Sequence, residues 1–161
     1  MKFPRGKTPY VLNFLSRGLK FFYPCANVAI MKNHYQVIVQ TSYKDRPYDF
    51  ELSAAIIVAE YFKTDIIFMR PTHLKTPDLK IRNEIWELKS PTGNSKNTIH
   101  NVFVTARRQS YNVIIDLRRC KMHEQKAFFR IREAYNKRRR RKCKLLVINK
   151  TGKIVDISEI I

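Results

Sequence analysis

An acidic residue and a lysine stand two positions apart in the apolar stretch EIWELKSPTG, as Glu87 and Lys89. A second acid, Asp78, follows a proline nine residues before Glu87. Two carboxylates can bind a hard divalent cation through oxygen, and Mg²⁺ favours such sparse sites, which waters and a substrate phosphate complete. The cation acidifies its bound water, and a lysine can orient or deprotonate that water. These residues therefore fit metal-dependent hydrolysis of a phosphodiester.

The three side chains share a face only if two short strands, residues 77–82 and 85–90, pair as an antiparallel hairpin. In that register we expect Asp78 to lie opposite Lys89. Side chains alternate along a strand, so a register shift of two residues keeps Asp78, Glu87 and Lys89 on one face, whereas a shift of one residue separates them.

The turn of this hairpin sets the register. We place the turn at Asn83 and Glu84, which predicts that Lys80 lies opposite Glu87. Trp86 alternates away from the face that carries Glu87, and we predict that it belongs to the core.

A helix earlier in the chain supplies another acid. Residues 47–62 have apolar residues at helical spacing, and this predicted helix carries Glu51 in its first turn and Glu60 near its end. Nine residues span about two and a half turns, so the two glutamates point to different faces and cannot both join one site. The order of a helical acid, Pro-Asp and Glu-x-Lys is the PD-(D/E)xK nuclease pattern, whose spacing is loose.

The remaining sequence predicts the elements that position these residues, because strand-like runs alternate with helical periods. Strands are predicted at 34–42, 64–71, 77–83, 84–90 and 111–117, helices at 47–62, 97–109 and 123–140, and a closing hairpin around Thr151 and Gly152. The alternation predicts an α/β (α+β) fold with a mixed central sheet flanked by helices and a PD-(D/E)xK nuclease-like core. We assign residues 1–48 as a basic and aromatic segment and 49–161 as the nuclease-like domain, the two forming one structural unit.

The charge of the chain indicates a polyanionic partner. Its 161 residues include 32 Lys and Arg against 13 Asp and Glu, a net charge of +19. Nucleic acid is the leading candidate, ahead of an acidic protein or a membrane surface. No apolar run is long enough for a signal peptide or a membrane span, and the three cysteines, which lie far apart, are expected to be reduced. The four histidines have no spacing typical of a zinc site and are expected at the surface or satisfied.

Further polar and basic residues are candidates for substrate binding. They are Ser90, Thr92, Asn97, Gln109, Arg138, Arg139, Arg140 and Arg141. A loop leading into a helix N-terminus can hold a phosphate through hydroxyl and backbone N–H groups, although residues 94–97 fit a turn and a helix cap equally well. The arginine run suits a phosphate backbone or an acidic inhibitor. Asp116, which ends a predicted strand beside Arg118 and Arg119, is expected to form an ordinary ion pair.

The stretch from about residue 49 to 157 resembles the C-terminal tRNA-cleaving toxin domains of CdiA-type contact-dependent growth inhibition proteins. The most specific pieces are KTPDL, WELKSPTG followed by KNTI, and QSYNVIIDLRR. The resemblance implies the PD-(D/E)xK fold, with Asp78 and Glu87 as metal ligands, Lys89 as the catalytic lysine and Glu51 as the helical acid.

The resemblance also implies a function. It predicts a toxin that cleaves tRNA in the cytoplasm of a target cell, requires a divalent metal (Mg²⁺, with Mn²⁺ or Zn²⁺ as alternatives), and is neutralised by an acidic immunity protein. One alternative is a DNA endonuclease of the same superfamily, because the same metal site hydrolyses either backbone and no nearby residue is identified that would recognise a 2′-hydroxyl. The other alternative is a non-catalytic basic RNA-binding protein.

Overall fold

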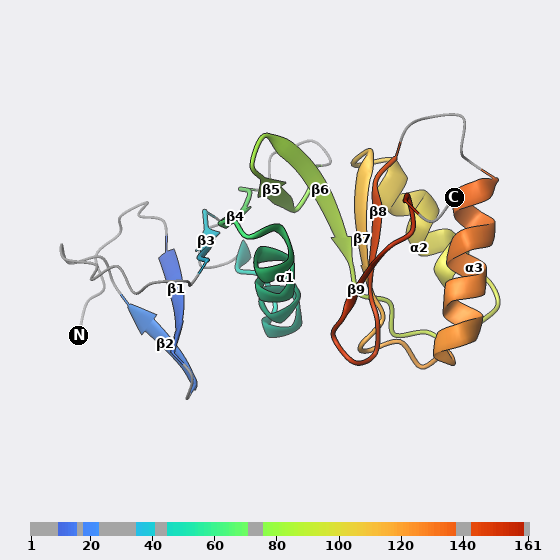
Figure 1. Ribbon diagram of the computed structural model, residues 1–161, viewed down its shortest axis with the longest axis horizontal. Coiled ribbons are helices and arrows are strands. Elements are labelled where there is room, and N and C mark those ends of the chain that lie inside the picture. The colour runs from blue at the N-terminus through green and yellow to red at the C-terminus, as the bar shows by residue number, and fades with distance from the viewer. Residues whose placement is uncertain are drawn as a thin grey trace.

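The computed structural model describes residues 10–15, 18–22, 35–40, 45–70, 76–137 and 143–159. Within these residues the chain forms three helices and one mixed sheet of nine strands (Figure 1). The helices are α1 (Asp49–Phe62), α2 (Thr98–Arg107) and α3 (Glu124–Asn136). The strands are β1 (Tyr10–Leu15), β2 (Gly18–Phe22), β3 (Val37–Val39), β4 (Ile66–Phe68), β5 (Leu79–Ile81), β6 (Glu84–Lys89), β7 (Asn112–Asp116), β8 (Leu145–Ile148) and β9 (Ile154–Asp156).

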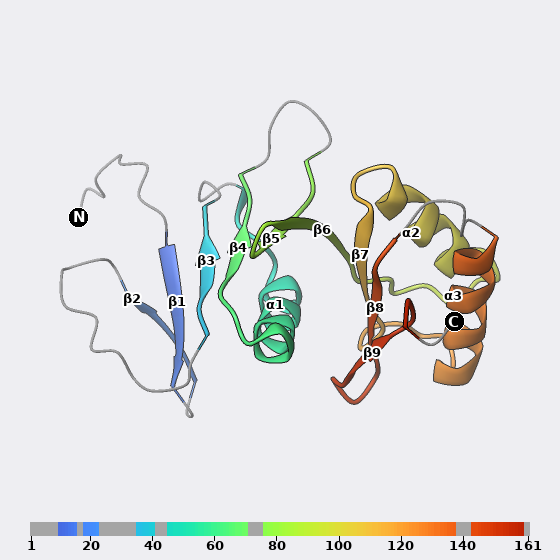
Figure 2. The ribbon, with the colours of Figure 1, turned by 45° about the horizontal axis from the view of Figure 1, so that its top comes forward.

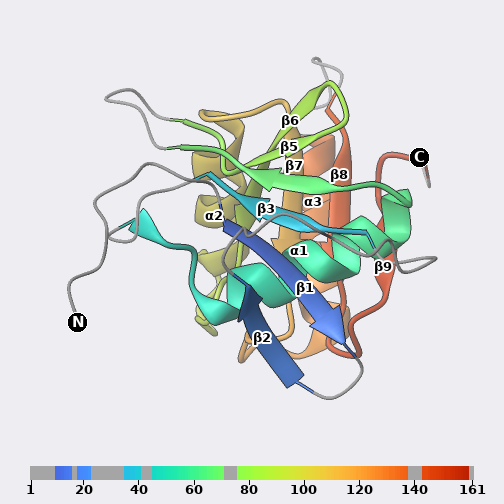
Figure 3. The same cartoon turned by 90° about the vertical axis from the view of Figure 1, so that its left-hand side faces the viewer.

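The strands are ordered β2-β1-β3-β4-β5-β6-β7-β8-β9 across the sheet (Figure 2). The pairs β3/β4, β6/β7 and β7/β8 are parallel, and the other neighbours are antiparallel. Viewed from the β1 and β2 end, β1 to β4 cross the view while β7 and β8 run almost vertically, so the sheet has the strong twist expected of strands of L-residues (Figure 3).

The helices cover opposite faces of this sheet and bury two separate apolar cores. One core packs α1 against β3 to β6 and includes the fully buried Trp86, whose ring meets Phe62 edge to face. The other packs α2 and α3 together over the far face of β7 and β8, around Phe103 and Ile131. Strand β6 contributes Trp86 and Leu88 to the first core, so Glu87 between them points to the opposite face of the sheet.

The predicted fold class is confirmed, because a mixed sheet is flanked by helices. Each predicted strand and helix from residue 34 onward is present within the described residues. Residues 34, 41–42, 71 and 138–140 of the predicted ranges lie outside the described part of the chain. The sequence did not predict β1 and β2, where aromatic and basic residues follow no clear period. Among the described residues, no helix has the length and apolar character needed to cross a lipid bilayer. Cys120 and Cys143 are buried and free, whereas Cys25 lies outside the described residues.

Candidate active site

The β5–β6 hairpin turns one residue earlier than predicted. Ile81 pairs with Glu84, so the turn consists of Arg82 and Asn83. Arg82 takes a left-handed backbone conformation with φ of 53°, and its guanidinium donates a hydrogen bond to the Phe62 carbonyl at 2.8 Å. This bond ties the turn to the end of α1, which explains why an arginine occupies a position that glycine or asparagine usually takes.

The predicted pairing register was therefore wrong by two residues. Lys80 lies opposite Ile85 instead of Glu87. Continuing the same ladder by one pair places Asp78 opposite Glu87, instead of opposite Lys89. Because a two-residue shift leaves every side chain on its own face, Asp78, Glu87 and Lys89 still share one face of the hairpin.

Glu87 is the most deeply enclosed charged group of this face. Its side chain is 0% exposed, and the Lys89 ammonium lies against its Oε1 atom. The carboxyl group of Glu87 contacts both the Lys89 ammonium and the Asp78 carboxyl. Burial, followed by the neighbouring Asp78 carboxylate, raises the pKa of Glu87 to about 7 against the opposing effect of Lys89. A buried carboxylate that meets a second carboxyl group is costly to ionise, and such groups concentrate at functional sites.

Asp78 stands directly beside Glu87 just before β5. The backbone N–H of Leu88 donates to Asp78 Oδ2 at 3.0 Å, which fixes the carboxylate against β6. Burial raises the pKa of Asp78, while Lys89 and the Leu88 N–H act to lower it. The hairpin thus brings together two acids and one lysine, with the lysine side chain 29% exposed and able to reach solvent.

The first turn of α1 brings Glu51 to the same group. Its pKa is raised chiefly by burial and further by the Asp78 carboxylate, and it is lowered by the Tyr48 N–H, Lys89 and Arg119. Glu51 Oε2 accepts a hydrogen bond from the Tyr48 N–H at 2.9 Å, the reciprocal bond of a helix capping box. A purely structural role as a cap would explain this bond, but it leaves the second carboxylate oxygen for the site.

Glu60, the rival acid on α1, lies elsewhere. It is exposed and pairs with Lys63, three residues further along the helix, at 3.2 Å. The helical-phase argument thus separated the two glutamates correctly, because Glu51 and not Glu60 is close to Asp78 and Lys89.

The donor set suits a hard cation that keeps most of its own waters. Among residues 35–40, 45–70, 76–137 and 143–159, no three His, Cys, Asp or Glu side chains are arranged as a ready-made metal cage. Asp78 and Glu87 are adjacent oxygen donors, because each carboxyl group acts on the pKa of the other. Two carboxylates completed by water and phosphate match Mg²⁺ or Mn²⁺ better than Zn²⁺, which favours nitrogen and sulfur ligands. His100 and His123 are exposed, while His34 and His73 lie outside the described residues.

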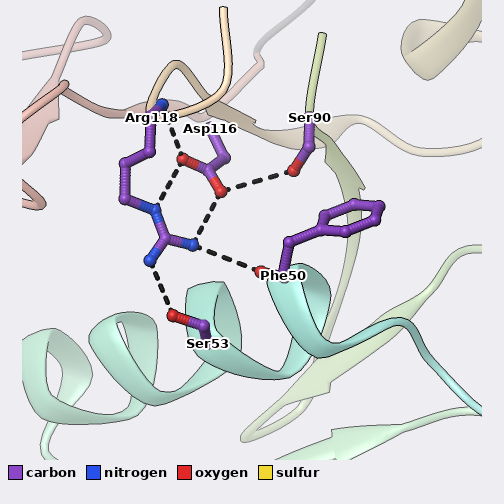
Figure 4. A network of polar contacts seen from close by, with 5 residues as sticks. All are labelled: Phe50, Ser53, Ser90, Asp116 and Arg118. Atoms are coloured by element: carbon purple, nitrogen blue, oxygen red, sulfur yellow. Dashed lines mark hydrogen bonds and ion pairs between the residues drawn. The ribbon is translucent and has the colours of Figure 1, made fainter. Parts of the chain in front are cut away.

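A polar network anchors the start of α1 to the end of β7 (Figure 4). Asp116 is fully buried and accepts two hydrogen bonds from the Arg118 guanidinium, at 2.9 and 2.8 Å. The same guanidinium donates to Ser53 Oγ at 2.7 Å and to the Phe50 carbonyl at 3.2 Å. The ion pair expected for Asp116 is present, and through Ser53 and Phe50 it holds the helical turn that carries the site acid.

The predicted substrate-binding residues are dispersed. Ser90 follows β6 and donates to Asp116 Oδ2 at 3.3 Å, so its hydroxyl joins the α1 anchor (Figure 4). Thr92 and Asn97 are exposed in the loop before α2. Gly93 in that loop is required for packing, since an added Cβ would lie 2.6 Å from Thr98 Oγ1.

The other predicted substrate-binding residues are Gln109 and the arginine run. Gln109 lies in the turn before β7, where neighbouring Ser110 donates to the Ile85 carbonyl at 2.9 Å. This turn is at the start of β7, whereas Ser90 and Asp116 lie at its far end, so the structure does not bring Gln109 together with Ser90. Arg138 to Arg141 lie outside the described residues.

Three residues beside the site were not singled out from the sequence. Tyr48 and Phe50 stack in parallel at the start of α1, with ring centroids 5.4 Å apart, and the Arg119 guanidinium carbon lies 3.8 Å from the Phe50 centroid. The pair of aromatics two residues apart at a helix start was visible in the sequence, but the arginine comes from a segment about seventy residues away, which only folding brings near.

Comparisons with known proteins agree with part of the resemblance. Residues 75–154 match the family model of the contact-dependent growth inhibition CdiA C-terminal domain. This segment contains Asp78, Glu87 and Lys89, whereas Glu51 precedes it. The solved CdiA-CT/CdiI toxin and immunity complex from Burkholderia pseudomallei is similar over 74% of this chain and 97% of that chain, with 18% identity and a TM-score of 0.46. That similarity is too low to support an argument. No curated protein matches the chain.

Proposed function

We propose that this chain, which carries a contact-dependent growth inhibition CdiA C-terminal toxin domain over residues 75–154, is a metal-dependent endoribonuclease that cleaves tRNA. The observation that carries the proposal is the convergence of Glu51, Asp78, Glu87 and Lys89 from α1, β5 and β6. Acids whose pKa values are raised by burial and by each other are typical of sites that bind cations and move protons.

Each residue has a distinct part in this chemistry. Asp78 and Glu87 would hold a divalent metal, which when bound would supply an acidified water and offset charge that develops on the phosphate. Lys89 Nζ lies against Glu87 and reaches solvent, so it orients the attacking water and donates to a phosphate oxygen. Glu51, whose pKa is raised, takes up or returns a proton at the carboxylate oxygen that does not cap the helix.

RNA is the preferred substrate on the basis of the sequence motifs shared with tRNA-cleaving toxin domains and the net charge of +19. The charge attracts any nucleic acid, so it favours neither RNA nor DNA by itself. Duplex DNA is therefore the competing substrate in any assay, and binding of RNA without cleavage is the competing outcome.

The proposed toxin activity implies a cellular compartment in which the toxin acts and a protein that inhibits it. We place the action of this chain in the cytoplasm of the target cell, where tRNA is found, since CdiA C-terminal toxin domains are delivered into such cells. A nuclease that is poisonous to its producer requires an immunity protein, and the excess of Lys and Arg predicts that this partner is acidic.

The test is to incubate the protein with total tRNA, other cellular RNA and duplex DNA, with Mg²⁺ or with a chelator, and to sequence the ends produced. We expect tRNA cleavage that the chelator abolishes. Ala substitution of Asp78, Glu87 or Lys89 is expected to lower cleavage at least about 100-fold with the fold intact, because these residues act as one unit.

A matched pair of variants on α1 separates the site from its surroundings. Glu51→Ala is expected to lower cleavage, while Glu60→Ala, which removes an exposed acid from the same helix, leaves it unchanged. Full activity without Glu87 contradicts the proposed site, and cleavage of DNA in preference to tRNA contradicts the proposed substrate.

A further inference from the structure

The start of α1 presents an unusual exposed aromatic surface beside the candidate site. Tyr48 is 69% exposed, the largest fraction among the exposed large hydrophobic residues of the described chain. Its ring stacks on Phe50 at an interplanar angle of 8°, and Arg119 lies over the Phe50 ring. The exposed ring and its stacked partner present a flat apolar face that a planar ligand can cover.

The backbone holds this surface in place. The Tyr48 carbonyl accepts hydrogen bonds from the N–H groups of Glu51 and Leu52, at 2.9 and 3.0 Å, and its own N–H donates to Glu51 Oε2. The Phe50 carbonyl accepts a bond from Arg118, which is itself paired with a buried aspartate. The aromatic stack is therefore built in advance, so a ligand that binds it loses little additional protein entropy.

The same contacts connect the stack to the catalytic candidates. Tyr48 is bonded directly to Glu51, whose carboxylate is influenced by Asp78 and Lys89. Arg119, over the Phe50 ring, also acts on the Glu51 carboxylate. A ligand resting on Tyr48 would consequently lie beside the turn of α1 that carries Glu51.

We propose that Tyr48, Phe50 and Arg119 form a stacking platform for an unpaired nucleobase next to the phosphate that the site cleaves. This inference rests on the proposed function. Every base has a π face that stacks on tyrosine, and arginine adds a planar cation that strengthens an aromatic stack. A base inside a duplex has both faces covered, so the platform selects RNA loops or ends over helical stems.

The position of the platform favours a nucleobase over a protein side chain. Tyrosine and arginine are also common at protein interfaces, so the immunity protein is the rival occupant. A nucleotide bound through its phosphate at the carboxylates, however, has its base beside that phosphate, and the stack adjoins the helix turn that carries Glu51.

The test measures stacking without cleavage. A short single-stranded RNA that contains 2-aminopurine is titrated with the protein in a chelator, because fluorescence of that base falls when it stacks. Tyr48→Leu keeps an apolar side chain but removes the ring, and we expect it to weaken binding roughly 5- to 100-fold and to remove most of the quenching. Tyr48→Phe is expected to keep both.

Tyr111 provides the matched control. It is 57% exposed and also carries an arginine over its ring, Arg107 at 5.0 Å, but it stands at the start of β7, away from the end that joins α1. Tyr111→Leu is expected to leave affinity and quenching unchanged. Single-stranded RNA is expected to compete better than duplex RNA of equal length for the wild type, and Tyr48→Leu reduces this preference.

The outcomes distinguish the platform from the nuclease activity. Equal quenching by the wild type and Tyr48→Leu overturns the platform, even if both proteins cleave tRNA. Loss of quenching in Tyr48→Leu supports the platform even if no cleavage is found, in which case only the proposed reaction fails. Equal losses in Tyr48→Leu and Tyr111→Leu, or a loss of immunity-protein binding with RNA binding intact, also overturn it.

Discussion

Glu87 is expected to make the stability of the metal-free protein fall as the pH rises. The pKa of this carboxyl is about 7 in the fold, against an ordinary value of 4.5. Below pH 4.5 the group is protonated in both the folded and the unfolded chain, so it imposes no pH dependence there. Between the two values only the folded chain keeps the proton, and raising the pH removes this proton and leaves a buried charge.

The size of the effect follows from the same two values. Each pH unit of this window is worth about 1.4 kcal/mol, so the whole window corresponds to a loss of up to about 3 kcal/mol. Raised pKa values at Asp78 and Glu51 act in the same direction. Glu133 cannot cancel them in this window, because its pKa is lowered to about 2 and its contribution is lost only in stronger acid.

Glu87→Gln removes the titrating group while keeping its shape. We expect this variant to be more stable than the wild type by about 1 to 3 kcal/mol near pH 8 in a chelator, and to be equal to it near pH 4.5. Urea unfolding at both values measures the difference. Glu84→Gln is the matched control, since Glu84 is 42% exposed on the same strand and pairs with Lys144. Added Mg²⁺ is expected to stabilise the wild type and not Glu87→Gln.

The prediction is wrong if Glu87→Gln gains no stability relative to the wild type between pH 4.5 and about 8, or if Glu84→Gln shows the same gain. The first result would mean that the carboxylate is solvated and the site is open to water. The second would mean that the gain reflects the general charge of the protein instead of the buried site.

Two further predictions concern the frame of the site and its surroundings. Arg118→Ala leaves the buried Asp116 carboxylate uncompensated, so we expect a loss of stability of about 3 kcal/mol, measured by urea unfolding, whereas Arg118→Lys recovers part of it. Replacing Arg138 to Arg141 by glutamine is expected to flatten the slope of log affinity for RNA against log salt by up to about 3 to 4, with turnover at saturating substrate almost unchanged. An unchanged slope would exclude contact between this run and the RNA backbone.

The grouping of Asp78, Glu87 and Lys89 was predictable because it depends only on the alternation of side chains along two paired strands. The turn was placed one residue too late, yet the resulting error of two residues in register left the face unchanged. Glu51 could be separated from Glu60 for a similar reason, since helical phase is a local property. Predictions of this kind survive errors in the position of a turn.

The contacts that hold α1 in place could not be predicted in this way. Arg118 meets Ser53 across 65 residues of sequence, and Arg119 meets Phe50 across a similar span. No local period indicates such pairs, because they arise from how β7 and α1 pack after both have formed. We expected the Ser90 hydroxyl to be available for phosphate, but it donates to Asp116, a contact that the local sequence pattern does not indicate.

Several acidic residues outside the candidate site each have a lysine or arginine beside them. These acids are Asp49, Glu60, Glu84, Asp116 and Glu133.

Inside the site, Glu51, Asp78 and Glu87 share Lys89, with Arg119 acting on Glu51, and burial raises the pKa of all three acids. The net charge of +19 draws a polyanion toward the surface, but these carboxylates repel its phosphates at contact. In the proposed nuclease, a divalent cation between the carboxylates and the phosphate would remove that repulsion. We therefore expect the basic exterior to set how fast nucleic acid arrives and the acidic site to make its final approach depend on a metal.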